Sequence, residues 1–93
     1  MPTSLSAQKR VRQDARRRLR NRTVKAAVKT HVRKVEAALE RGDIEAARAA
    51  YNAAARVIDK AVSKNVLHRN TAARRKARLA RRINTAASST PQA

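Results

Sequence analysis

Residues 24–39 read VKAAVKTHVRKVEAAL, and the spacing of their apolar side chains decides the fold class. The stripe consists of Val24, Val28, Val32, Val35 and Leu39, which recur at intervals of three and four residues. This interval is typical of the buried face of an α-helix. The segment therefore predicts a helix with one packed side, and a packed side requires partner helices.

A turn signal follows this stripe at Gly42 and Asp43. Glycine readily adopts the left-handed conformation that ends a helix, and the Asp43 carboxylate can cap the helix that follows. We therefore expect a first helix over about residues 5–41 and a second over about 44–63. The second helix repeats the three-and-four spacing at Ile44, Ala47, Tyr51, Ala54, Ile58 and Ala61.

A third helix is expected over about residues 69–86, after a break at residues 63–65 in which Asn65 is the best candidate for a left-handed cap. At 100° per residue its apolar side chains gather on one face, and five arginines are predicted on the opposite one: Arg74, Arg75, Arg78, Arg81 and Arg82. Lys76 breaks this segregation, and its stem could follow the packed face while its ammonium reaches solvent or a phosphate.

The predicted fold class is all-α: a three-helix bundle with a long, N-terminally extended first helix. One domain, residues 1–86, is followed by a tail over 87–93 whose composition is typical of disorder. The basic residues between Lys9 and Arg22 spread around the helical wheel, so this part of the first helix has no core-facing side. We expect it to fray when free and to become helical when phosphates surround it.

The charge distribution predicts a polyanionic partner. The chain has 24 Lys and Arg residues against 6 Asp and Glu residues, and its formal net charge is +18. Residues 1–35 hold twelve basic residues and one acid, and residues 64–93 hold eight basic residues and no acid. Nucleic acid is the commonest partner for such a surface. With Tyr51 as the only aromatic residue, the chain lacks stacking platforms, which favours recognition of backbone and shape.

Other functional classes find little support in the sequence. The acids are scattered and no nucleophile or phosphate-loop motif is present, so no enzymatic activity, cofactor or small-molecule substrate is expected. With no cysteine and two distant histidines, no metal site is expected either. The first residues turn basic at Lys9 without the long apolar stretch that secretion requires, so we expect no signal peptide. The absence of cysteine suits a reducing cytoplasm but does not by itself give the location.

Three side chains have two readings each. His31 and Tyr51 lie at core positions of their helices, which favours packing over a functional role. His68 precedes the third helix, where RNA contact and plain capping are equally supported.

Residues 64–79 read KNVLHRNTAARRKARL. This stretch resembles the signature of the bacterial small-subunit ribosomal protein S-twenty family, in which a lysine and a glycine precede an apolar pair, then His-Lys-Asn, and later Arg and Leu. Ser6-Ala7, Lys9-Arg10, Asn21 and Lys25 match the family as well. Asn65 stands in place of the usual glycine, Arg69 of the lysine, Ala77 of the serine and Leu5 of a basic residue.

The resemblance implies a structural protein of the 30S subunit, located in the ribosome. It implies a monomer that binds 16S ribosomal RNA directly, in its 5′ domain and near the long penultimate helix. The residues expected to contact RNA are Lys9, Arg10, Arg12, Arg16, Arg17, Arg18, Arg20, Arg22, Lys25, Lys29, Arg33, His68, Arg69, Asn70, Arg74, Arg75, Lys76, Arg78, Arg81 and Arg82.

Two rival functions share the same charge. A histone-like DNA-binding protein would bind duplex DNA as well as folded RNA. A membrane-active cationic peptide is the second rival because the third helix is amphipathic and basic. Its alanine-rich face lacks Trp and Phe, so we expect no membrane partner.

Overall fold

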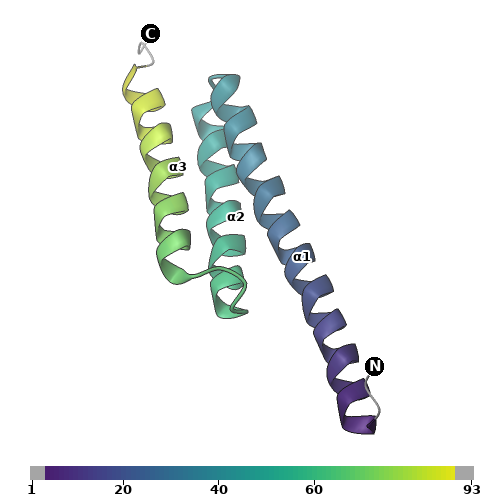
Figure 1. Cartoon of the computed structure of the whole chain (residues 1–93). Coiled ribbons are helices and arrows are strands. Elements are labelled where there is room, and N and C mark those ends of the chain that lie inside the picture. The colour runs from purple at the N-terminus through teal and green to yellow at the C-terminus, as the bar shows by residue number, and fades with distance from the viewer. Residues whose placement is uncertain (1–3, 90–93) are drawn as a thin grey trace.

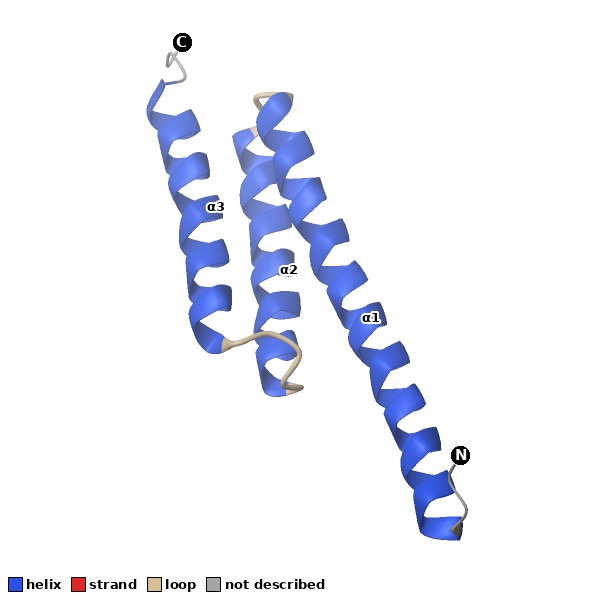
Figure 2. Ribbon diagram, in the orientation of Figure 1, coloured by secondary structure: helices blue, strands red, loops and turns tan. Residues whose placement is uncertain are grey.

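The computed structural model describes residues 4–89, and within that range it consists of three α-helices and no strand (Figures 1 and 2). They are α1 (Leu5–Glu40), α2 (Ile44–Ser63) and α3 (Arg69–Ser89). The predicted fold class, an all-α three-helix bundle with a long first helix, is confirmed.

The molecule is a rod because α1 is much longer than its partners. The principal extents are 71 × 22 × 16 Å. At 1.5 Å per residue the 36 residues of α1 span about 54 Å. Figure 1 shows its N-terminal part running past the ends of α2 and α3. We call residues 5–23 the extension, and residues 24–89 the bundle.

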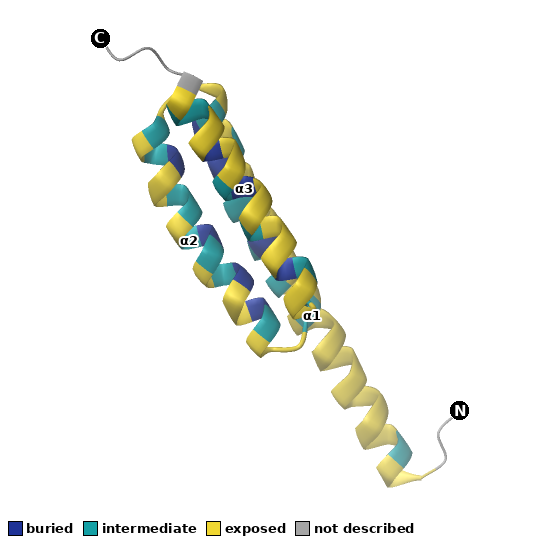
Figure 3. Cartoon of the chain, turned by 90° about the vertical axis from the view of Figure 1, so that its left-hand side faces the viewer, coloured by how far each residue is buried: buried dark blue, intermediate teal, exposed yellow. Residues whose placement is uncertain are grey.

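The core is confined to the bundle, with α2 between the other two helices. α1 packs extensively on α2, α3 packs on α2, and α1 hardly contacts α3. Figure 3 shows buried residues along the helices of the bundle and none in the extension. The buried side chains are Val28, Val35, Ala38, Ala47, Ala54, Ile58, Ala61, Ala72, Leu79 and Ile83. Half of them are alanines, so the helices pack closely but remove little apolar area from water.

The C-terminal ends of α1 and α2 are closed by tight turns that reverse the chain. Gly42 has φ +72° and Asn65 has φ +60°, so both predicted left-handed caps are confirmed. At the first turn the Asp43 N–H donates to the Ala38 carbonyl. At the second, the Val66 N–H donates to the Ala61 carbonyl in the same way. These are Schellman motifs, which satisfy carbonyls that the helix itself leaves without a donor.

The C-terminal end of α3 differs from the expectation. The helix continues to Ser89, so the predicted disordered tail is wrong for residues 87–89. These residues include no glycine or proline, and the Ser88 hydroxyl donates to the Asn84 carbonyl at 2.9 Å within the helix. The rest of the predicted tail, residues 90–93, lies outside the described residues.

Candidate nucleic-acid interface

The extension presents basic side chains in every direction. All residues from Gln8 to Arg20 are exposed, and so are its large apolar side chains Leu5, Val11 and Leu19. The structure shows two ion pairs among residues 4–89, and neither involves the extension. The basic residues predicted there, from Lys9 to Arg22, are therefore free of acidic partners. Ser4 caps the helix start by accepting the Ala7 N–H at 3.1 Å.

A second basic surface lies between α1 and α3, on the side where those helices hardly meet. It is a groove of about 410 Å³ that we call the α1–α3 groove. Its floor is apolar, with Val32 and Leu79, and its rim is charged. The rim residues are Lys29, Arg33, Glu36, Arg75, Arg78 and Arg82.

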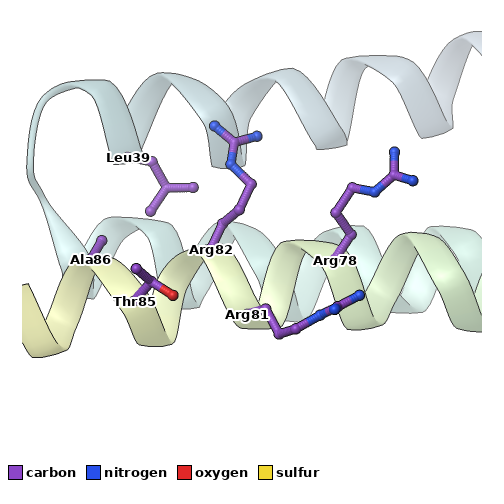
Figure 4. A pocket seen from close by; sticks show the side chains of 6 residues that line it. All are labelled: Leu39, Arg78, Arg81, Arg82, Thr85 and Ala86. Atoms are coloured by element: carbon purple, nitrogen blue, oxygen red, sulfur yellow. The ribbon is translucent and has the colours of Figure 1, made fainter.

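The groove continues toward the α1–α2 turn in a hollow, drawn in Figure 4, that is lined by Leu39, Arg78, Arg81, Arg82, Thr85 and Ala86. In this view Arg78 and Arg82 point from α3 toward α1, while Arg81 lies along the far side of α3. The expectation that the five arginines of α3 share one face opposite the core is therefore wrong.

The reason is the open α1 side of α3. The packed face of α3 is directed at α2, and Arg75, Arg78 and Arg82 lie about 40–100° around the helix from Leu79. A helix enclosed on two sides would bury these positions. In this structure Arg75, Arg78 and Arg82 border the groove instead. The basic residues of α1 and α3 therefore form one surface.

A single acidic residue interrupts this rim. The Glu36 Oε1 atom lies 3.4 Å from Arg82 Nη1. The Glu36 and Arg82 side chains are 44% and 48% exposed, so water screens the pair and its contribution to stability is small.

Lys76 lies on the other flank of α3, away from the groove. Its Nζ donates to Asp59 Oδ1 of α2 at 2.8 Å. This hydrogen bond, together with the nearby Asp59 charge, raises the pKa of Lys76 above its ordinary value of 10.5. The ammonium that was expected to reach solvent or phosphate is instead paired within the protein, because Asp59 stands opposite it on α2.

His68 caps α3. Its Nδ1 accepts the Asn70 N–H at 3.1 Å, and its carbonyl accepts the Ala72 N–H at 3.0 Å. Of the two readings of His68, the structure thus shows the capping one. Because Nδ1 is the acceptor, the neutral ring carries its proton on Nε2, which is able to donate to an anion. The side chain is exposed, as are those of Arg69 and Asn70.

The two core readings agree with the structure. Tyr51 and His31 are half-buried, and Tyr51 packs against a cluster that includes Val35 and Ala54.

The basic line on α1 joins the groove to the extension. Arg18, Arg22, Lys25 and Lys29 line a further hollow of about 530 Å³ together with Asn21 and Ala26. Lys29 belongs to both this hollow and the α1–α3 groove. A continuous basic track therefore runs from the extension to the far end of α3.

The sequence did not identify the uncharged and acidic residues that border the basic track. Glu36, Val32 and Leu39 border the groove or its hollow, and Thr85 lies at its end. A signal for Glu36 was available, since it follows Lys29 and Arg33 at helical spacing on one side of the valine stripe. No sequence signal showed that α1 and α3 would stay apart.

Other kinds of site are not found in the described part of the chain. Among residues 4–89 there is no group of three His, Cys, Asp or Glu residues placed to hold a metal ion. None of the three described helices combines the length and the apolarity that crossing a bilayer requires.

A helical rod with a small core and an exposed basic track is typical of the class of structural proteins that bind a polyanion. The family model described as Ribosomal protein S20 matches residues 2–84. A relative from Natranaerobius thermophilus, named small ribosomal subunit protein bS20, is 50% identical over 88 residues, covering 95% of this chain and all of the relative. Relatives of the same name from Thermobifida fusca and Cutibacterium acnes are 49% and 45% identical, covering 85% and 94% of this chain and 86% and 99% of their own lengths. The chain belongs to the Ribosomal protein S20 family.

Proposed function

We propose that this chain binds 16S ribosomal RNA directly in the 30S subunit and stabilises its folded arrangement through contacts between Lys or Arg side chains and phosphates. The coarser statement follows from the family: the protein is a structural component of the small ribosomal subunit that associates with ribosomal RNA, and it is not an enzyme. Its place is the ribosome in the cytoplasm.

The observation that supports direct binding is the exposed basic track, in which most of the cations have no acidic partner among residues 4–89. Of the residues predicted to contact RNA, Lys76 and Arg82 have acidic partners among the described residues, and the Arg82 pair is loose. Guanidinium groups present fixed forks of donors that match phosphate oxygens. Lys76 is the weakest member of the predicted set because Asp59 already holds it.

The shape suggests how one small protein could hold distant RNA segments. The extension projects from the bundle, so its basic residues and those of α3 can engage different strands. By resemblance to the family, these segments are the 5′ domain and the long penultimate helix of 16S RNA. We propose that the protein acts there as a monomer.

The test is nuclease footprinting on 16S RNA combined with affinity measured at several salt concentrations. If about ten phosphates are neutralised, the log-log slope of affinity against salt should be near −9. Protection by the wild type, reduced when Arg74, Arg75 and Arg78 are changed to Glu, is the expected result. Absence of protection, or a slope near zero, would refute direct binding.

A competition experiment separates this function from the histone-like alternative. Duplex DNA at equal nucleotide concentration should displace little protein from 16S RNA in moderate salt. Equal affinities for DNA and folded RNA would favour the DNA-binding function.

A further inference from the structure

We propose that one strand of the RNA backbone enters the α1–α3 groove and closes the bundle on its open side, with a phosphate replacing Glu36 as the partner of Arg82. The inference rests on the proposed function, and it names the site at which the folded part of the protein holds RNA.

The bundle is open on the side between α1 and α3. In a closed three-helix bundle each helix packs along both others, whereas here the backbones of α1 and α3 come close at few positions. Val35 and Ala38 share a core cluster with Leu79 and Ile83, and the groove lies beside it. Val32 and Leu39 on that side of α1 are only half-buried. An apolar floor between two helices is incomplete without an occupant, and the sugars of a nucleic acid strand can cover it while the phosphates stay at the rim.

The second argument is charge. Lys29 and Arg33 on α1 stand across the groove from Arg75, Arg78 and Arg82 on α3, and all five side chains are exposed. Like charges facing one another raise the energy of the ligand-free protein, and an anion placed between them lowers it. The groove therefore selects an anionic occupant.

The third argument is the Arg82–Glu36 pair. At 3.4 Å and nearly half exposed it is a weak contact, and a carboxylate is the protein group most like a phosphate in charge and geometry. Glu36 thus holds Arg82 at the groove in the absence of RNA. A phosphate makes the same kind of contact with Arg82 and also reaches the neighbouring Arg78.

The length of the basic track favours a polymer over an isolated anion or an acidic peptide. The basic track from Arg18 to Glu36 covers 19 residues of α1, about 28 Å at 1.5 Å per residue. Its cations repeat along the whole length, which suits a chain with a regularly spaced charge. A nucleic acid backbone has that property.

A matched pair of double variants tests the site. Arg75→Gln with Arg82→Gln removes two groove charges, and Arg48→Gln with Arg56→Gln removes two exposed charges from α2, outside the groove and outside the set predicted to contact RNA. Circular dichroism first checks that both variants keep the helicity of the wild type. We expect the groove variant to lose at least tenfold more affinity for 16S RNA than its control, and its salt slope to fall by about 1.8.

The outcomes separate the groove from RNA binding in general. If the control variant loses as much affinity as the groove variant, the groove proposal fails while direct RNA binding stands. If the wild type itself does not bind 16S RNA, the proposed function fails. Glu36→Gln should tighten binding about threefold, and weaker binding would show that Glu36 positions Arg82 instead of competing with phosphate.

A tethered cleavage probe identifies the occupant. The chain has no cysteine, so a single introduced cysteine can carry iron–EDTA at one known position. In small subunits reconstituted with the labelled protein, probes at Thr85→Cys and Gln13→Cys should cut nearby RNA, and one at Asn52→Cys on α2 should cut little. Cleavage from position 13 without cleavage from position 85 would show that RNA does not enter the groove, and would overturn the proposal.

Discussion

The extension and the bundle are built from the same helical backbone, yet different forces hold them. In the bundle, Val28, Val35 and Ile58 are fully buried and both helix ends are capped by Schellman motifs. In the extension no side chain is buried, and eight basic residues lie within fourteen positions between Lys9 and Arg22. The bundle carries its own stability, whereas the extension depends on helix propensity and on its surroundings.

This difference gives each region a separate response to mutation. Changes in the core should lower the free energy of unfolding, and changes in the extension should lower RNA affinity with the fold intact.

The largest effect should come from Ile58→Ala in α2. The side chain is fully buried, and removing three carbons from such a site costs about 2–5 kcal/mol of stability. Because a small bundle has little stability to lose, we expect unfolding near room temperature in a circular dichroism melt. The control Val11→Ala removes an exposed side chain of the extension and should change the free energy of unfolding by less than about 0.5 kcal/mol. Equal destabilisation by both would contradict the confinement of the core to the bundle.

The next largest effect should follow from neutralising the extension. Arg16→Gln, Arg17→Gln and Arg18→Gln together should reduce the salt slope of RNA binding by about 2.7 and the affinity by at least roughly tenfold. The melting temperature of the free protein should stay within about two degrees, since these residues contact no core. A large drop in melting temperature would show that the extension supports the bundle.

A smaller effect is expected at the second turn. Asn65 has φ +60°, and replacing it with Ala should cost about 1 kcal/mol of stability. The reason is that alanine lacks the short polar side chain whose local hydrogen bonds let asparagine adopt the left-handed conformation. Asn65→Gly should be neutral or stabilising for the same reason. Urea denaturation of the two variants measures the difference, and equal stabilities would exclude the backbone conformation as the reason for asparagine there.

The smallest effect concerns the Lys76–Asp59 pair, whose side chains are 32% and 61% exposed. Replacing Lys76 with Met should cost at most about 1 kcal/mol at neutral pH. Since folding raises the pKa of Lys76, the stabilisation is complete below pH 10.5 and is lost as the pH rises through the folded-state pKa. The stability difference between wild type and the Met variant should therefore shrink in the alkaline range. A difference that persists there would mean that the lysine stem, through its packing, is what stabilises the protein.

The sequence was sufficient to predict the three helices and their caps. It was insufficient to predict how the helices are arranged relative to one another. The valine stripe, Gly42 and Asn65 act through local chemistry, so the helices and their caps were predictable. The placement of Arg75 and Arg82 was predictable only in part. At 100° per residue they lie about 40° and 60° from Leu79, beside the packed face, but whether that flank of α3 stays open depends on the separation of α1 from α3. Lys76 was misread for a similar reason, since its partner Asp59 lies 17 positions away on another helix.

The near absence of contact between α1 and α3 also bears on how the chain folds. Most tertiary contacts join α1 to α2 and α2 to α3, which are neighbours along the chain. A low mean sequence separation of contacts is typical of proteins that fold within microseconds to milliseconds. The α1–α2 hairpin can therefore form from contacts between neighbours along the chain before α3 packs on α2.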